Sequence, residues 1–138
     1  MKKTLLPGLQ QTFTHRVTDR QTVPSLLPES AIFAGMPHVL ATGYLVGLIE
    51  WGCMEAMQPH LNPGEGSVGT MINLTHTAPT PSGMKVTINV KCTAVEDRKT
   101  AWEFEAHDEK GPIGSGTHER FTVNWDRFKG KLEGKKAE

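Results

Sequence analysis

The 138-residue sequence is short of cysteine, of net charge and of long hydrophobic runs. Its two cysteines, Cys53 and Cys92, are too few for a disulfide framework. Fifteen Lys and Arg balance fifteen Asp and Glu, so no basic surface for holding DNA or RNA is expected. The longest charge-free apolar run, residues 39–49, is about half of the roughly 20 residues that span a bilayer. These absences predict a cytoplasmic protein that binds neither nucleic acid nor a membrane.

The N-terminus lacks the features of a signal peptide. Its apolar stretch is Leu5-Leu6, and Pro7-Gly8 interrupts it well short of a hydrophobic signal segment. The chain is long enough for one ordinary hydrophobic core and too short for two. We therefore expect a flexible N-terminus over residues 1–8, a single domain over residues 9–126 and a charged C-terminal tail over residues 127–138.

One long helix dominates the predicted secondary structure. Residues 39–58 are apolar nearly all round, which indicates a helix that is buried rather than lying on a surface. Pro59 and the following Asn62-Pro63-Gly64 turn end this helix. Alternating polar and apolar residues predict strands over residues 9–19, 68–77, 84–96, 100–108 and 113–125.

This combination predicts an α+β domain of the hot-dog type, with an antiparallel sheet of about five strands wrapped around one long apolar helix. Two sets of residues are expected to share a strand face each: Trp102, Phe104 and Ala106, and then Phe121, Val123 and Trp125. The tryptophans are interpreted as core or interface residues. So small a sheet has an exposed edge strand, and we expect a homodimer in which the sheet continues into the second subunit and covers this edge.

Glu50 is a carboxylate on an apolar helix face. Its helical neighbours are Val46, Cys53, Met54 and Met57. An isolated buried carboxylate is costly, so it either finds a partner or has its pKa raised. Two interpretations stay open: a structural hydrogen bond or dimer contact, and a base or nucleophile in a dry cleft.

His76 and Thr42 are the other candidates for chemistry. The period of two along the strand from Val68 places His76 on the side of Val68, Ile72 and Leu74, facing the helix. Thr42 stands at the start of the helix, where two interpretations are open. It is either an N-cap, or a hydroxyl that donates or attacks as a nucleophile beside free backbone N–H groups that can hold an oxyanion. Eight helical residues rise about 12 Å, so Thr42 cannot touch Glu50 of the same helix. A site with both needs two subunits or irregular backbone near Thr42.

The glycine-rich and histidine residues give weaker signals. Residues 64–69 lack the lysine and the spacing of a phosphate-binding loop. Gly69, inside a predicted strand, indicates either close approach of a ligand or a bulge. No metal site is predicted, because metal-ligand spacing is missing among His15, His38, His60, His107 and His118.

Four ordered blocks of the sequence resemble the fluoroacetyl-CoA thioesterase family of hot-dog enzymes. They are ATGYLVGLIEW (residues 41–51), PGEGSVGT (63–70), THTA (75–78) and IGSGTHER (113–120). The resemblance implies a homodimeric hydrolase that cleaves a short acyl-CoA without a cofactor, with sites at the subunit interface. It also implies that Thr42, Glu50 and His76 are the catalytic residues and that Gly69 lies beside the acyl group.

The resemblance further implies that the Pro-rich segment before the helix is an apolar lid over the acyl pocket. Phe33 keeps one lid phenylalanine, whereas Met36 stands where the family has a second, and methionine fills space less definitely than a ring. Arg120, with Arg98 and Lys99, is a candidate for holding the CoA phosphates. Two alternatives remain, a non-catalytic acyl-CoA sensor and an enoyl-CoA hydratase on the same fold.

Overall fold

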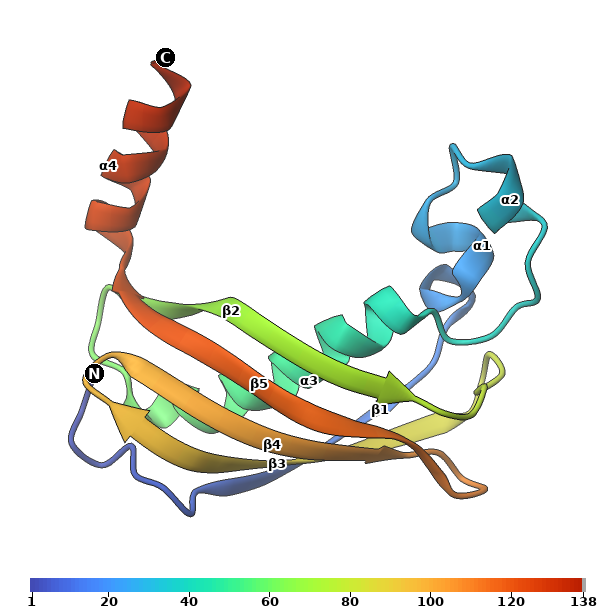
Figure 1. Ribbon diagram of the computed structural model, residues 1–138, viewed down its shortest axis with the longest axis horizontal. Coiled ribbons are helices and arrows are strands. Elements are labelled where there is room, and N and C mark those ends of the chain that lie inside the picture. The colour runs from blue at the N-terminus through green and yellow to red at the C-terminus, as the bar shows by residue number, and fades with distance from the viewer. Residues whose placement is uncertain (138) are drawn as a thin grey trace.

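The computed structural model describes residues 1–137 and shows a single sheet with a long helix across one face (Figure 1). All neighbouring strands are antiparallel, in the order β1-β3-β4-β5-β2. The strands are β1 (Gln10–Arg16), β2 (Glu65–His76), β3 (Lys85–Glu96), β4 (Lys99–His107) and β5 (Pro112–Asn124). The helices are η1 (Asp19–Gln21), α1 (Val23–Leu26), α2 (Ala31–Ala34), α3 (Thr42–Met57), η2 (Gln58–His60) and α4 (Trp125–Lys136).

The core lies between α3 and the sheet. Side chains on several sides of α3 are buried, among them Leu45, Leu48, Ile49, Cys53 and Met57. They pack with alternate residues of the central strands, namely Val86, Ile88, Val90, Cys92, Trp102, Phe104 and Ala106. The α+β class, the antiparallel sheet of five strands and the single long apolar helix are confirmed.

A β-bulge reverses the faces of β2 halfway along the strand. The register with β5 shifts between Gly69 and Met71, so one extra residue is inserted. Before the bulge Ser67 faces inward, paired with Thr122, and after it His76 does, paired with Gly114. Val68 therefore faces away from the core. The prediction that Val68 shares the face of His76 is wrong, because a strict period of two does not survive an inserted residue.

The buried face of β5 is polar. His118, Arg120 and Thr122 are buried, whereas Phe121 on the opposite face is 41% exposed. Alternation along a strand shows which residues share a face, but it does not say which face meets the core. Here the polar face can be buried because its side chains find partners inside the protein.

The two ends of the chain differ from the expected picture. The N-terminus, residues 1–8, was expected to be flexible, but Leu5 is 2% exposed and packs in the core. The Gly8 N–H also donates to the Cys92 carbonyl at 2.8 Å. Of the tail predicted over residues 127–138, residues 127–136 belong to α4, and residue 138 lies outside the described residues. This helix stands away from the sheet and has no buried residue (Figure 1). Within residues 1–137, no helix is long and apolar enough to cross a membrane.

Candidate active site

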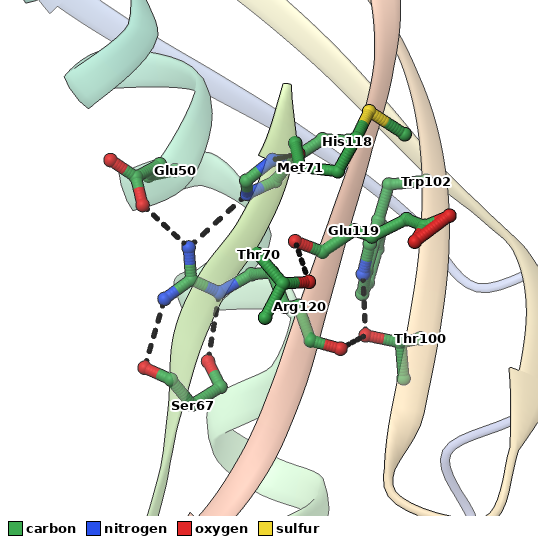
Figure 2. Close-up of polar contacts among 9 residues, drawn as sticks. All are labelled: Glu50, Ser67, Thr70, Met71, Thr100, Trp102, His118, Glu119 and Arg120. Atoms are coloured by element: carbon green, nitrogen blue, oxygen red, sulfur yellow. Dashed lines mark hydrogen bonds and ion pairs between the residues drawn. The ribbon is translucent and has the colours of Figure 1, made fainter. Parts of the chain in front are cut away.

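Glu50 and Arg120 form an ion pair between the middle of α3 and the inward face of β5 (Figure 2). Arg120 Nη1 donates to Glu50 Oε2 at 2.9 Å. The arginine side chain is 2% exposed and the glutamate side chain is 36% exposed. The carboxylate on the apolar helix face has thus found a partner, while one side of it stays open to solvent.

Three further hydrogen bonds fix the guanidinium in place. Arg120 Nε donates to Ser67 Oγ at 2.8 Å and Nη2 donates to the Ser67 carbonyl at 2.9 Å. Nη1 also lies 3.2 Å from His118 Nε2. A buried arginine that uses four of its five N–H groups in this way is held rigidly in one plane.

This burial does not favour CoA phosphates as the ligand of Arg120, and its role as a substrate-binding residue stays a prediction. Its charge is directed at Glu50 and Ser67 rather than at the surface (Figure 2). An arginine placed to contact a substrate's phosphates has to present its N–H groups to solvent. Arg120 lies on the strand face that covers the helix.

Gly69 lies against this ion pair, at the β2 bulge. A Cβ at this position would lie 2.6 Å from Glu50 Oε2, 3.3 Å from His118 Cε1 and 3.4 Å from Arg120 Nη1. The absence of a side chain is what allows the carboxylate to reach the β2 backbone. Of the two interpretations of Gly69, the structure shows the bulge. The space left by the missing side chain is taken by the Glu50 carboxylate, and the approach of a ligand to Gly69 stays a prediction.

Thr42 and His76 form a second pair at the N-terminal end of α3. The Thr42 hydroxyl lies 2.9 Å from His76 Nδ1. The N-cap residue is Ala41, so Thr42 is the first helical residue and the N-cap interpretation is wrong. His76 Nε2 is buried and has no hydrogen-bond partner among residues 1–137. Burial lowers the pKa of the His76 ring, which favours its neutral form at pH 7.

A hollow of about 270 Å³ adjoins this second pair. Its lining includes Val23, Val39 and Leu40 as well as Thr42 and His76. The lid segment begins beside it, since the Leu26 side chain of α1 lies 3.0 Å from where a Gly43 Cβ would be.

Of the two predicted lid residues, Phe33 is half-buried and Met36 is 44% exposed. Both belong to the segment that contains α1 and α2, which stands at the opposite end of the sheet from α4 (Figure 1). In this position they are available to cover a substrate near Thr42.

One chain does not bring the three predicted catalytic residues together. Thr42 contacts His76, whereas Glu50 contacts Arg120 and lies about 12 Å farther along the same regular helix. The irregular backbone considered for Thr42 is absent, because α3 is helical from Thr42 onward. Assembly from two subunits therefore remains the prediction.

Sequence reasoning missed His118 and Ser67. His118 was considered only as a metal ligand, although it stands two residues before Arg120 and so shares its strand face. Burial, and then the nearby Arg120 charge, lower the pKa of His118. Ser67 has no pattern of its own that would identify it.

Two other chemistries find little support in residues 1–137. No group of three or more His, Cys, Asp or Glu side chains lies together there in a way that could hold a metal ion. Cys53 lies near Arg120 and Glu50, but burial raises the pKa of its thiol to about 12, so it stays protonated and is a poor nucleophile.

Comparison with known proteins agrees with the four sequence blocks. Residues 17–126 match the family model described as fluoroacetyl-CoA-specific thioesterase. The chain is 49% identical over 127 residues to a fluoroacetyl-CoA thioesterase from Streptantibioticus cattleyicolor, covering 91% of each. It is also similar to a solved phenylalanine-to-alanine variant of the fluoroacetyl-CoA-specific thioesterase in complex with fluoroacetate and CoA, with 48% identity and a TM-score of 0.86. That match covers 88% of this chain and 98% of the other.

A more distant likeness concerns the fold alone. A Thermus thermophilus protein of the thioesterase superfamily is 24% identical, with a TM-score of 0.86 over 98% of this chain and 96% of its own. A hot-dog-like protein from Thermanaerovibrio acidaminovorans is 22% identical, with a TM-score of 0.79 over 94% of this chain and 91% of its own. The predicted hot-dog fold is therefore confirmed. Because the family model spans most of the chain and the sequence relative is nearly half identical, this chain belongs to the fluoroacetyl-CoA-specific thioesterase family.

Proposed function

We propose that this chain hydrolyses the thioester of a short-chain acyl-CoA to the free acid and CoA, at sites that two subunits complete. Its family places it among thioester hydrolases that act on acyl-CoA. The observation that carries the proposal is Glu50, a carboxylate fixed by Arg120 beside Gly69 with one side open to solvent.

In this proposal Glu50 supplies the reactive oxygen. The hydrogen bonds within residues 1–137 use only Oε2, which leaves Oε1 for chemistry. Oε1 either attacks the thioester carbon, releasing CoA and leaving an acyl anhydride that water cleaves, or takes a proton from the water that attacks. Rapid quench with labelled acyl-CoA separates the two routes, because only the first leaves acyl groups on the protein.

Thr42 and His76 hold the substrate and move a proton. The first N–H groups of α3 have no partners within the helix and lie at the positive end of its dipole, so they suit the oxyanion that forms from the thioester carbonyl. Thr42 orients the acyl group or the water. His76 relays the proton released by the attacking water to the leaving thiolate through Nε2, which has no partner within residues 1–137, and so ends as neutral as it began.

The edge strand β2 supports a homodimer. Met71 and Ile72 on this strand are exposed, and so is Met54 on α3, one helical turn after Glu50. An uncovered strand edge flanked by apolar side chains is a template for pairing with a second copy. A two-fold axis across β2 would bring the Thr42 end of one α3 toward the middle of the other.

Mixed dimers test whether the site is shared. We expect homodimers of His76→Ala and of Glu50→Gln each to lose roughly 10²- to 10⁴-fold in turnover. A heterodimer of the two variants can be isolated with two affinity tags. If each site takes Glu50 from one chain and His76 from the other, this heterodimer has one site with both changes and one site with neither, and it should show about half of wild-type turnover. A heterodimer as inactive as its parents would place Glu50 and His76 of one chain in the same site. Two differently tagged His76→Ala chains are the control.

The acyl group is the part of the proposal that the lid controls. Phe33 gives one rigid aromatic surface, while the flexible, exposed Met36 defines the pocket less tightly. We therefore propose a short acyl group, fluoroacetyl among those accepted. Thiol release from acetyl-, fluoroacetyl-, propionyl-, butyryl-, phenylacetyl- and long-chain CoA tests this by rank order.

The same panel, with crotonyl-CoA added, separates the proposed activity from the two alternatives. Binding of CoA esters without any release would favour a sensor, and water addition to crotonyl-CoA without release would favour a hydratase. The cytoplasmic location stays part of the proposal, in keeping with two buried cysteines that remain free thiols.

A further inference from the structure

We propose that His118 is a positioning residue, whose neutral ring holds the Arg120 guanidinium in the orientation that directs Nη1 at Glu50. The inference rests on the proposed role of Glu50 and deepens it. His118 is 2% exposed and lies on the inward face of β5, where it touches both the β2 bulge and Arg120 (Figure 2).

The hydrogen bonds determine the tautomer of the ring. His118 Nδ1 lies 2.7 Å from the Met71 carbonyl oxygen, which can only accept, so Nδ1 carries a proton. Nε2 lies 3.2 Å from Arg120 Nη1, which can only donate, so Nε2 carries a lone pair. A ring protonated at Nδ1 alone satisfies both neighbours, and that ring is neutral.

This arrangement gives each Nη1 hydrogen a partner. One N–H of Arg120 Nη1 donates to Glu50 Oε2 at 2.9 Å and the other donates to His118 Nε2. The Ser67 contacts hold the other end of the guanidinium. Without an acceptor at His118, the second Nη1 hydrogen is buried and unpaired, and the guanidinium gains by tilting away from Glu50 to satisfy it.

The same ring ties the guanidinium to the bulge. Met71 is the residue at which the β2 register resumes after Gly69, and its carbonyl accepts from His118. Gly69 in turn lies against Glu50, His118 and Arg120. His118 thus sets the spacing between the strand that bears the glycine and the strand that bears the arginine.

The surroundings of the ring favour its neutral form. The charged groups around it are Arg120 and Glu119 on its own strand and Glu50 on α3. Its neighbours across the sheet, Ile72 on β2 and Trp102 on β4, do not titrate. Burial and the Arg120 charge lower the pKa of His118, and the geometry gives the same result, since an added proton on Nε2 would face the Nη1 hydrogens.

Two conservative variants separate positioning from a structural role. His118→Gln puts an acceptor where Nε2 was and keeps the contact with Arg120, whereas His118→Asn retains a donor for Met71 and cannot reach Arg120. We expect His118→Gln to stay within about threefold of wild type. His118→Asn should lose roughly 10- to 100-fold in kcat with little change in KM, the size expected for a hydrogen bond to a charged group. His107→Gln, on a half-buried histidine at the end of β4, is the control.

Several results would overturn the proposal. One such result is a His118→Asn variant with full activity. Another is that His118→Asn and His118→Gln lose activity equally and that each loses thermal stability to the same extent, as a purely structural role would require. Nitrogen-15 NMR of labelled histidine gives a readout that needs no activity: His118 should show a proton on Nδ1 and be more than half neutral at about pH 6.5, the ordinary pKa value of histidine. A charged ring or the opposite tautomer at that pH refutes the inference, even if no thioester is cleaved and the proposed function fails separately.

Discussion

The substitution Gly69→Ala should remove activity while leaving the fold intact. Its new Cβ would lie 2.6 Å from Glu50 Oε2, whereas ordinary contacts begin at about 3.4 Å, so the carboxylate has to retreat by roughly 0.8 Å. A displacement of about 1 Å in a reacting group can cost roughly 100-fold. We therefore expect kcat/KM to fall by about 30- to 100-fold.

The stability of Gly69→Ala should change little. Gly69 is absent from the residues with positive φ, so alanine can adopt its backbone conformation. Replacing such a glycine stabilises by about 0.4–1 kcal/mol through the unfolded chain, which offsets part of the crowding. The nearest atom is the end of a flexible side chain, which can move at small cost. We expect the melting temperature to stay within about 4 °C of wild type.

Thiol release from a short acyl-CoA, together with thermal unfolding, checks both expectations. Gly130→Ala on α4 is the control, because a Cβ there meets nothing within 4 Å. Wild-type kcat/KM in a folded Gly69→Ala protein would refute the argument that Glu50 acts from its observed position. A large loss of stability would show instead that the bulge itself cannot accept a side chain.

Three further predictions concern stability. Arg120→Met removes the partner of Glu50, and urea unfolding should show that the free energy of unfolding falls by about 2–3 kcal/mol. This is at or below the usual range for a buried ion pair, because Glu50 is partly exposed. A decrease of less than about 1 kcal/mol would contradict this expectation. The pKa values of His76 and His118 are lowered in the folded protein, so the stability that the neutral rings contribute is complete above about pH 6.5. This stability is lost as the pH falls through the pKa values of the folded state, and the melting temperature should decline with it. The decline should be less steep in His118→Gln. Deleting residues 129–138 should shift the melting temperature by less than about 2 °C, since α4 has no buried residue; a larger shift in the dimer would mean that α4 packs on the second subunit.

The sequence by itself determined the long helix and the five strands of this protein and the identity of its candidate catalytic residues, whereas the helices α1, α2 and α4 were not predicted. The all-round apolar pattern of α3 and the period of two along β3 and β4 follow directly from which side chains have to leave water. Glu50 stood out for the same reason, as a charge on an apolar helix face. The family followed from short blocks in fixed order, which depend on the sequence alone.

Only the tertiary structure decided which faces and which partners these residues have. The bulge at Gly69 reverses the faces of β2, and the polar face of β5 is the buried one, because Arg120 finds Glu50, Ser67 and His118 inside. Periodicity cannot show either result, since it is blind to inserted residues and to contacts distant in sequence. The separation of Thr42 from Glu50 followed from helix rise alone, whereas the pairing of Arg120 with Glu50, 70 residues apart, existed only once the chain was folded.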